Sequence, residues 1–176
     1  MYEYYFEWNK YLLIDEFLAY NWNNQVMEGM IAVRITRHEQ PTTTNGEPTE
    51  IESSFPEFEL KGTQGETVKN SDISGKYTLI SVVPDINTRV CSLSTKKFNE
   101  DVDSFPNINF LTISTNTIEQ QQDWCAAEGV TKMKLLSDAE GSLGKSIGIF
   151  VEDGRVDARS IWILNPDGEV AYRELI

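Results

Sequence analysis

The sequence predicts one α/β domain, and three observations support this prediction. The chain has 176 residues, which is close to the length of a single domain, and 40% of them are hydrophobic, enough to form a buried core. Strand and helix patterns alternate through its second half, as in an α/β domain. The most apolar run, residues 77–83, is typical of a central strand that is buried on both faces.

The first 29 residues differ in composition from the rest of the chain. They hold nine of its 19 aromatic residues but only one basic residue, Lys10. Four of their residues recur at helical spacing: Tyr4, Trp8, Tyr11 and Leu12. We therefore expect an N-terminal extension over 1–29, with an amphipathic helix through about Tyr20, ahead of a domain over 30–176. The extension either docks on the domain or a partner, or is an addition without a role upstream of Met30.

The first part of the predicted domain has short elements. Residues 30–36 alternate apolar and polar side chains, which is typical of a half-buried strand. Residues 39–54 are rich in Thr, Pro, Glu and Asn-Gly, so we expect a loop or a weak hairpin. Residues 55–60 alternate again, and a turn over 72–76 leads into the apolar strand.

Two helices and a strand follow the apolar run. A helix over about 88–104 places its apolar residues near one face: Val90, Leu93, Phe98, Val102 and Phe105. Residues 108–113 form the next predicted strand. Thr117 and Gln120 have the spacing of a capping box, which predicts a helix that ends at Gly129, a residue suited to the left-handed cap.

The last part of the chain predicts a buried piece and a hairpin. Leu135 and Leu136 form the short buried piece, and residues 160–164 and 169–172 flank Asn165-Pro166-Asp167-Gly168, a strong hairpin turn. The sequence given ends at Ile176, directly after the second strand of this hairpin.

The charge balance argues against two classes of partner. The chain has 28 acidic and 15 Lys or Arg residues, a formal net charge of −13, and such a polyanion repels phosphate backbones and anionic lipid. No apolar run approaches the roughly 18 residues that span a bilayer, and no export signal is visible. We therefore expect a cytoplasmic protein that binds neither nucleic acid nor membranes.

The chain has two cysteines, Cys91 and Cys125, 34 positions apart. In a reducing compartment, redox chemistry, metal binding or ordinary burial explains such a pair better than a structural disulfide. Metal binding is disfavoured, because the only histidine, His38, is distant in sequence and two thiols with one imidazole fall short of a zinc site. Their spacing also excludes a Cys-X-X-Cys motif.

The candidate site lies in the run from Pro84 to Cys91, between the apolar strand and the first long helix. If Asn87 or Thr88 caps that helix, Cys91 falls in its first turn, where free backbone N–H groups favour a thiolate. The Thr88 hydroxyl can hydrogen-bond the sulfur, and the Pro84 ring can shield it and end the strand. The alternative is a buried cysteine at an ordinary helix start.

Pro84, Thr88 and Cys91, spaced Pro-X-X-X-Thr-X-X-Cys, resemble the peroxidatic motif of the peroxiredoxins. The wider run 81–91, continued through Lys97-Phe98-Asn99-Glu100, is similar to one subfamily, the bacterial thiol peroxidases or atypical two-cysteine peroxiredoxins. Three ordered motifs over about residues 30–176 make coincidence improbable.

The second and third motifs lie further along the chain. Residues 123–129, Asp-Trp-Cys-Ala-Ala-Glu-Gly, resemble the segment with the subfamily's resolving cysteine, here Cys125. Residues 158–164 resemble the strand with its active-site arginine, here Arg159. Judged from the residues alone, Cys125 could instead be a core cysteine beside Trp124. Arg159 could be a surface arginine paired with Asp157 or Glu152, with Arg89 as the rival cation.

The resemblance implies a thioredoxin-like fold: a central mixed sheet flanked by helices, with an N-terminal strand or hairpin. The family continues with another helix after the last strand, so we expect a C-terminally short domain with a less covered sheet face. It also implies hydroperoxide as substrate, thioredoxin or a similar dithiol as reductant and a homodimer, with no metal or organic cofactor.

The implied reaction has three steps. The Cys91 thiolate attacks the hydroperoxide while Arg159 stabilises the charge on oxygen, Cys125 converts the resulting sulfenic acid to an intrachain disulfide, and the reductant restores both thiols. The competing hypothesis is a non-catalytic redox sensor or an inactive truncated relative.

Overall fold

The computed structural model describes residues 34–37 and 40–176. The chain divides into two units, Met1–Met30 and Ile31–Ile176, and all described residues belong to the second. The predicted amphipathic helix before Tyr20 and the single histidine, His38, lie outside the described residues. The boundary between an extension and a domain therefore stays a prediction.

Strands and helices alternate in the middle of the described chain, between a run of strands at each end. In chain order they are β1 (Arg34–Arg37), β2 (Gln40–Thr43), β3 (Glu59–Gly62), β4 (Thr67–Lys69), α2 (Asn70–Ile73), β5 (Tyr77–Val83), α3 (Arg89–Asp101), the 3₁₀ turn η1 (Val102–Ser104), β6 (Ile108–Ser114), α4 (Ile118–Glu128), β7 (Lys134–Ser137), α5 (Ser142–Ser146), β8 (Phe150–Val151), β9 (Val156–Asp157), β10 (Ser160–Leu164) and β11 (Val170–Leu175).

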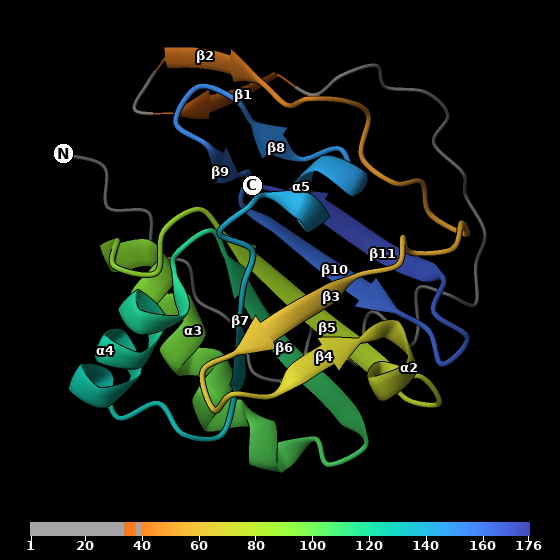
Figure 1. The fold of residues 1–176 in the computed structure, drawn as a ribbon. Coiled ribbons are helices and arrows are strands. Elements are labelled where there is room, and N and C mark those ends of the chain that lie inside the picture. The colour runs from red at the N-terminus through yellow and green to blue at the C-terminus, as the bar shows by residue number, and fades with distance from the viewer. Residues whose placement is uncertain (1–33, 38–39) are drawn as a thin grey trace, which may run out of the picture. The chain divides into compact units, whose positions relative to one another are not determined.

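The main sheet has seven strands in the order β11-β10-β5-β6-β7-β3-β4 (Figure 1). The neighbours β5, β6 and β7 are parallel, whereas β10 and β3 run antiparallel to them. The prediction of a central mixed sheet flanked by helices is confirmed. Because both parallel connections are expected to be right-handed, α3 and α4 lie on the same face of the sheet.

The apolar strand β5 divides the core into two clusters, one on each face of the sheet. Leu79 and Val83 belong to the cluster beneath α3 and α4, and Ile80 and Val82 belong to the other. The α3/α4 cluster has eight buried members: Val83, Ile86, Cys91, Phe110, Trp124, Val130, Met133 and Leu135. This alternation explains why five of the seven residues of β5 are apolar, as in a strand buried on both faces.

Both long helices occur where the sequence predicts them. The Thr117 and Gln120 side chains form the predicted capping box of α4, and Gly129 is its left-handed C-cap with φ 68°. Thr88 is the N-cap of α3, which ends at Asp101 and continues into η1. The expectation that Leu93 shares the apolar face of α3 is wrong, because its side chain is 57% exposed.

Several short elements differ from the predictions. The strand expected over 55–60 begins only at Glu59, because Phe55 and Phe58 pack in the core and the Phe58 N–H donates to the Asn70 side chain instead of a neighbouring strand. By contrast, the expected N-terminal strand or hairpin is present, because Gln40–Thr43 forms β2 and pairs antiparallel with β1. Periodicity did not predict α5, β8 or β9, since they have only two to five residues each.

The C-terminal hairpin is confirmed, with β10 and β11 antiparallel around the Asn165–Gly168 turn. Only Ile176 follows β11 in the sequence given. On β10, Trp162 is fully buried, whereas Ile161 and Ile163 on the opposite face are part-buried. Within 34–37 and 40–176, none of the helices has the length and apolar character needed to cross a membrane.

Candidate active site

Cys91 lies in the first turn of α3, directly after the sheet's central strand. Strand β5 ends at Val83, a five-residue loop follows, and Cys91 is the third residue of the helix. Thr88, the N-cap, has an extended backbone and makes no side-chain cap hydrogen bond. Because Cys91 is in the first turn of α3, its sulfur lies near the positive end of the helix dipole. Cys91 is also fully buried, so the sulfur is out of bulk water.

Two polar groups contact the Cys91 sulfur. The Thr88 hydroxyl oxygen and Nη2 of Arg159 each lie 2.8 Å from Sγ. A guanidinium only donates hydrogen bonds, so Arg159 is a charged donor to the Cys91 sulfur. The Thr88 hydroxyl also lies 3.0 Å from the Asp85 carbonyl oxygen. With its single proton it donates either to that carbonyl or to the sulfur.

The fold, not the sequence spacing, brings Arg159 to Cys91. Strand β10 pairs antiparallel with β5 so that Ser160 lies opposite Val82, which places Arg159 beside the end of β5. Its backbone is held there because the Ile176 N–H donates to the Arg159 carbonyl. The alternative of a surface arginine paired with Asp157 or Glu152 is therefore wrong.

The loop before α3 is anchored to the start of α4. The Pro84 carbonyl accepts a hydrogen bond from the Thr115 hydroxyl at 3.1 Å, and the Ile86 N–H donates to the Asn116 side chain at 2.8 Å. Partial burial acts to raise the pKa of Asp85, but hydrogen bonds from Asn116 and the nearby Asn87 outweigh it and hold that pKa below its usual value. The Pro84 ring is part-exposed, and its predicted shielding of the sulfur stays a prediction.

Cys125 lies on α4 and packs against the cluster that contains Cys91. Both cysteines are free thiols. Cys125 is part-buried, and this burial raises the pKa of its thiol. Its neighbour Trp124 is buried, so the pair belongs to the apolar core beneath α3 and α4. In the fold described here, burial therefore disfavours the thiolate form of Cys125.

Comparison with known proteins identifies the family. The model of the AhpC/TSA family matches residues 51–173. The chain belongs to the AhpC/TSA family. The thiol peroxidase of Listeria innocua is 38% identical over 144 residues, which cover 81% of this chain and 87% of that protein. The thiol peroxidase of Bacillus subtilis is 34% identical over 137 residues, covering 77% and 82%.

Two solved structures confirm the thioredoxin-like fold. The peroxiredoxin-like protein from Aquifex aeolicus matches with a TM-score of 0.76 at 22% identity, over 84% of this chain and 88% of that one. A thiol peroxidase from Chromobacterium violaceum matches with a TM-score of 0.73 at 16% identity, over 85% and 88%. The predicted resemblance to the bacterial thiol peroxidases is confirmed.

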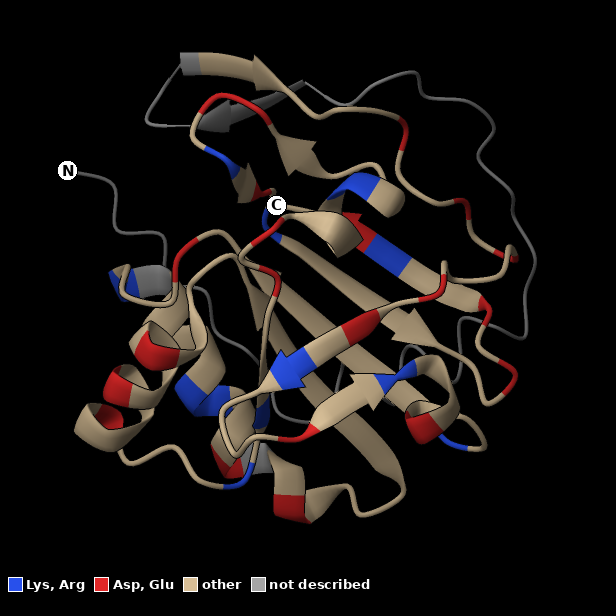
Figure 2. Ribbon diagram, viewed as in Figure 1, with Lys and Arg blue, Asp and Glu red and all other residues tan. Residues whose placement is uncertain are grey.

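A groove lies between α3 and α4. Its volume is about 530 Å³, and eight residues line it: Asn87, Arg89, Ser92, Leu93, Asp123, Trp124, Ala127 and Glu128. Arg89, the rival cation, lines this groove, whereas the sulfur contact is made by Arg159. The charged residues of α4 are all acidic, which Figure 2 shows as red bands on that helix.

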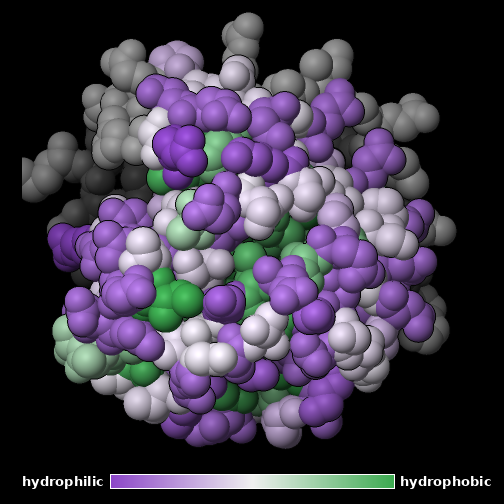
Figure 3. All heavy atoms as spheres, in the orientation of Figure 1, coloured by the Kyte–Doolittle hydropathy of each residue, from purple (hydrophilic) through white to green (hydrophobic). Residues whose placement is uncertain are grey.

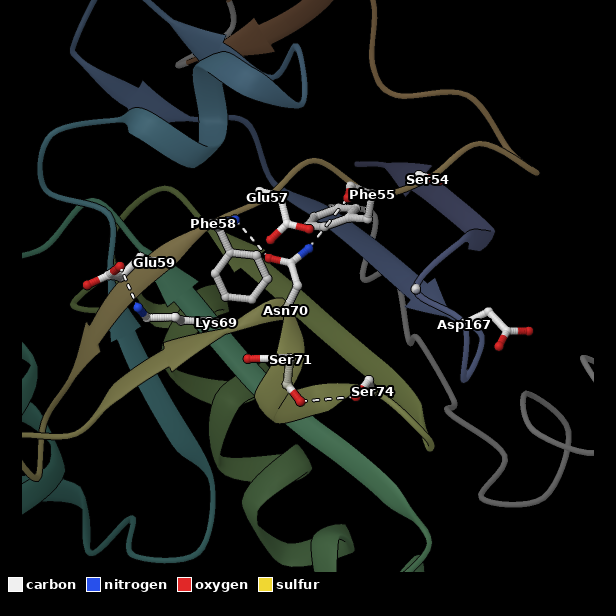
Figure 4. A pocket seen from close by; sticks show the side chains of 11 residues that line it. Ser54, Phe55, Glu57, Phe58, Glu59, Lys69, Asn70, Ser71, Ser74 and Asp167 are labelled. Carbon is white, nitrogen blue, oxygen red and sulfur yellow. Dashed lines mark hydrogen bonds and ion pairs between the residues drawn. The ribbon is translucent and has the colours of Figure 1, made fainter.

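A second pocket, of about 650 Å³, lies at the other end of β5 (Figure 4). Ser74, which lines this pocket, precedes β5, whereas Cys91 follows the opposite end of that strand. A seven-residue strand is about 20 Å long at the rise of an extended chain, so the pocket and the sulfur lie at different ends of the sheet. Its polar groups are engaged with one another: Lys69 pairs with Glu59, and the Asn70 amide bonds the backbone around Pro56. It therefore has no direct part in chemistry at the sulfur.

Sequence reasoning missed a buried carboxyl group close to Arg159 in the chain. Asp157 is fully buried, and neither of its oxygens accepts a hydrogen bond from the described residues. Burial and then the adjacent Asp138 carboxyl raise the pKa of Asp157 to about 8, while the Lys145 charge acts in the opposite direction. A proton on Asp157 can be shared with Asp138. Nothing in the local pattern around Asp157 distinguishes it from a surface residue.

Among the described residues, no group of three or more His, Cys, Asp or Glu side chains is arranged to hold a metal ion. The face in Figure 3 is largely hydrophilic, with small apolar areas between polar side chains. The large apolar residues that are exposed are scattered along the described chain: Ile51, Tyr77, Leu93 and Ile176.

Proposed function

We propose that this chain is a thiol-dependent peroxidase that reduces hydrogen peroxide and alkyl hydroperoxides at Cys91. The observation that carries the proposal is the pair of 2.8 Å contacts to the Cys91 sulfur, from the Arg159 guanidinium and the Thr88 hydroxyl. The family and the relatives named thiol peroxidases support the same reaction class.

In the first step the Cys91 thiolate attacks the terminal oxygen of the hydroperoxide. An S–O bond forms as the O–O bond breaks, the sulfur is oxidised to a sulfenic acid, and the leaving oxygen takes a proton to become water or an alcohol. Arg159 donates to the thiolate before the reaction and to the peroxide oxygens during it, where negative charge moves. Because Cys91 is fully buried, the part-exposed Arg159 has to shift to admit the substrate.

In the second step Cys125 resolves the sulfenic acid. Its sulfur attacks the Cys91 sulfur, an S–S bond forms, and water leaves. The two Cα atoms must come within about 7 Å for this bond, so an end of α3 or α4 unwinds first. Unwinding also exposes Cys125, which removes the burial that raises the pKa of its thiol.

The third step and the cellular setting follow from this chemistry. A thioredoxin-like dithiol reduces the Cys91–Cys125 disulfide by exchange and is itself oxidised to a disulfide. Two free thiols and bacterial relatives support a reducing, cytoplasmic setting. We also expect a homodimer, which the resemblance to the bacterial thiol peroxidases implies.

The experiment is a coupled assay of peroxide reduction with thioredoxin, thioredoxin reductase and NADPH. The wild-type chain should consume many equivalents of peroxide, and Cys91→Ser should consume none above background. Cys125→Ser should form a sulfenic acid on Cys91, detected by dimedone labelling, but no intrachain disulfide. The matched control is Ser92→Ala, which changes the residue next to Cys91 without removing a sulfur or a contact to it.

The competing hypothesis of a redox sensor predicts a different outcome. A sensor would take up about one equivalent of peroxide per chain and stop, because its disulfide is read by a partner instead of being recycled. A single equivalent consumed in the presence of the full reducing system would contradict the proposed enzyme. If peroxide-treated wild type forms no intrachain disulfide, the resolving role is contradicted, since Cys91 and Cys125 are the only cysteines of the chain.

A further inference from the structure

We infer that Asn116 is a positioning residue, whose side-chain amide holds the loop before α3 and the start of α4 in the arrangement that the Cys91 reaction needs. This inference rests on the proposed function, because it assigns to Asn116 an effect on the same sulfur. Asn116 follows β6, is 8% exposed and touches neither cysteine in any described contact.

Both ends of the Asn116 amide bond the loop that precedes α3. Its Oδ1 accepts from the Ile86 N–H at 2.8 Å, and its Nδ2 donates to Oδ1 of Asp85 at 3.0 Å. A side chain that accepts from one loop residue and donates to the preceding one fixes both the position and the rotation of the loop. The Ser137 hydroxyl donates to the backbone carbonyl of Asn116 at 2.7 Å and so ties the backbone of this residue to β7.

From Asp85 the hydrogen bonds continue to the sulfur. Oδ1 of Asp85 also accepts from the backbone N–H and the side chain of Asn87, at 3.0 and 3.1 Å. The Asp85 carbonyl lies 3.1 Å from the Thr88 N–H and 3.0 Å from its hydroxyl, which in turn contacts Cys91 Sγ. Asn116 therefore acts on Cys91 through Asp85 and Thr88.

The same amide also reaches the helix that carries the second cysteine. Nδ2 of Asn116 lies 3.4 Å from Oε1 of Gln120, the residue that closes the capping box of α4 with Thr117. One side chain thus links the start of α4 to the loop of the peroxidatic cysteine. Breaking its bonds should loosen both elements together, which reduces the fraction of molecules with Thr88 in place against the sulfur.

The charges around Asn116 allow a specific exchange. Asn116→Asp keeps an acceptor for the Ile86 N–H but places a second carboxylate against Asp85, which is repulsive. Adding Asp85→Asn removes this repulsion and restores a donor and acceptor pair with the roles reversed, because the new amide donates to the carboxylate at position 116. The bonds from Asn87 are given up, since in the wild type the same oxygen, Oδ1 of Asp85, accepts from both Asn116 and Asn87. A residue that merely fills space would gain nothing from the second substitution.

The experiment compares wild type, Asn116→Asp and Asp85→Asn/Asn116→Asp by stopped-flow reaction with hydrogen peroxide and by iodoacetamide alkylation of Cys91 in a Cys125→Ser background. Asn116→Asp should lower both rate constants by about tenfold, the size expected from replacing a hydrogen bond to a charged group by like-charge contact. The double variant should recover to within about threefold of wild type.

Asn99→Asp is the matched control, because Asn99 also uses its side-chain oxygen to accept two backbone N–H groups and has no carboxylate among its described partners. It should leave both rate constants within about twofold of wild type. If Asn116→Asp does not fold at 25 °C, Asp85→Ala removes the same contact from the loop side and should lower both rate constants in the same direction.

Two results would overturn the inference: wild-type rate constants in Asn116→Asp, or a double variant no faster than the single one. Failure of the proposed function can be distinguished from failure of this inference. If the wild-type chain does not react with peroxide, the alkylation rate of Cys91 still depends on the positions of Thr88 and Arg159. In that case the order of the three alkylation rates alone decides the role of Asn116.

Discussion

The buried Asp157 makes the stability of this protein depend on pH in an unusual direction. Its carboxyl group is fully buried next to Asp138, whose oxygens already accept hydrogen bonds from the backbone and hydroxyl of Ser142 and from the Gly144 N–H. Asp157 therefore folds as a neutral acid, and Asp157→Asn mimics this protonated form with a side chain that cannot ionise.

The magnitude follows from the difference in pKa between the two states. The pKa of Asp157 is about 8 in the folded protein, against an ordinary value of 3.8 for an aspartate in the unfolded chain. Below pH 4 both states keep the proton. Between pH 4 and 8 only the unfolded chain releases it, so the free energy of unfolding falls by about 1.4 kcal/mol per pH unit. At pH 7 the loss amounts to about 4 kcal/mol, and above pH 8 the slope vanishes.

The assay is urea unfolding followed by tryptophan fluorescence at pH 5, 6, 7 and 8. Asp157→Asn should resemble wild type in stability near pH 4 and become progressively more stable than it toward pH 8, by up to about 5 kcal/mol. Asp167→Asn, at an exposed position, is the control for losing one acidic residue and should run parallel to wild type. Parallel curves for wild type and Asp157→Asn between pH 5 and 8 would refute a neutral buried Asp157.

Two further predictions concern Arg159 and Gly144. Arg159→Gln should lower the second-order rate constant for hydrogen peroxide by about a hundredfold, because it removes the charged donor at 2.8 Å from Cys91 Sγ. Arg159→Lys should recover only part of this rate constant. An unchanged rate constant in stopped-flow measurements of Arg159→Gln would contradict this role. Gly144→Ala should lower the free energy of unfolding by about 1–3 kcal/mol, because a Cβ there would lie 1.6 Å from Oδ1 of Asp157. Gly46→Ala, whose nearest neighbour lies at 3.9 Å, should unfold at nearly the wild-type urea concentration.

The long elements were predictable because their signals are local. The strand over 77–83 has the bounds that the sequence predicts, because it is an apolar run between a turn and a loop. The helix α4 begins and ends where the capping box and Gly129 place its limits, since both signals depend only on residues within one turn of the helix end.

The short elements could not be predicted because their stability comes from tertiary contacts. Among the described residues, the two-residue strands β8 and β9 pair only with each other. The five-residue helix α5 has two N–H groups, those of Ser142 and Gly144, that donate to the Asp138 side chain outside the helix. Leu93 shows the converse error: helical spacing placed it on the apolar face, but the groove between α3 and α4 leaves it exposed. Periodicity identifies a face only where another element covers it.

The candidate site divides along the same line. Cys91 and Thr88 are three residues apart at a helix start, so their contact follows from local geometry and was visible in the sequence. Arg159 is 68 residues from Cys91, and no spacing rule connects them; only the resemblance to a family suggested the pair, and the antiparallel register of β10 on β5 is its physical cause. Asn116 had neither kind of signal. Its role depends on an amide that meets a loop 30 residues earlier in the chain, and such a contact is determined by the order of strands in the sheet.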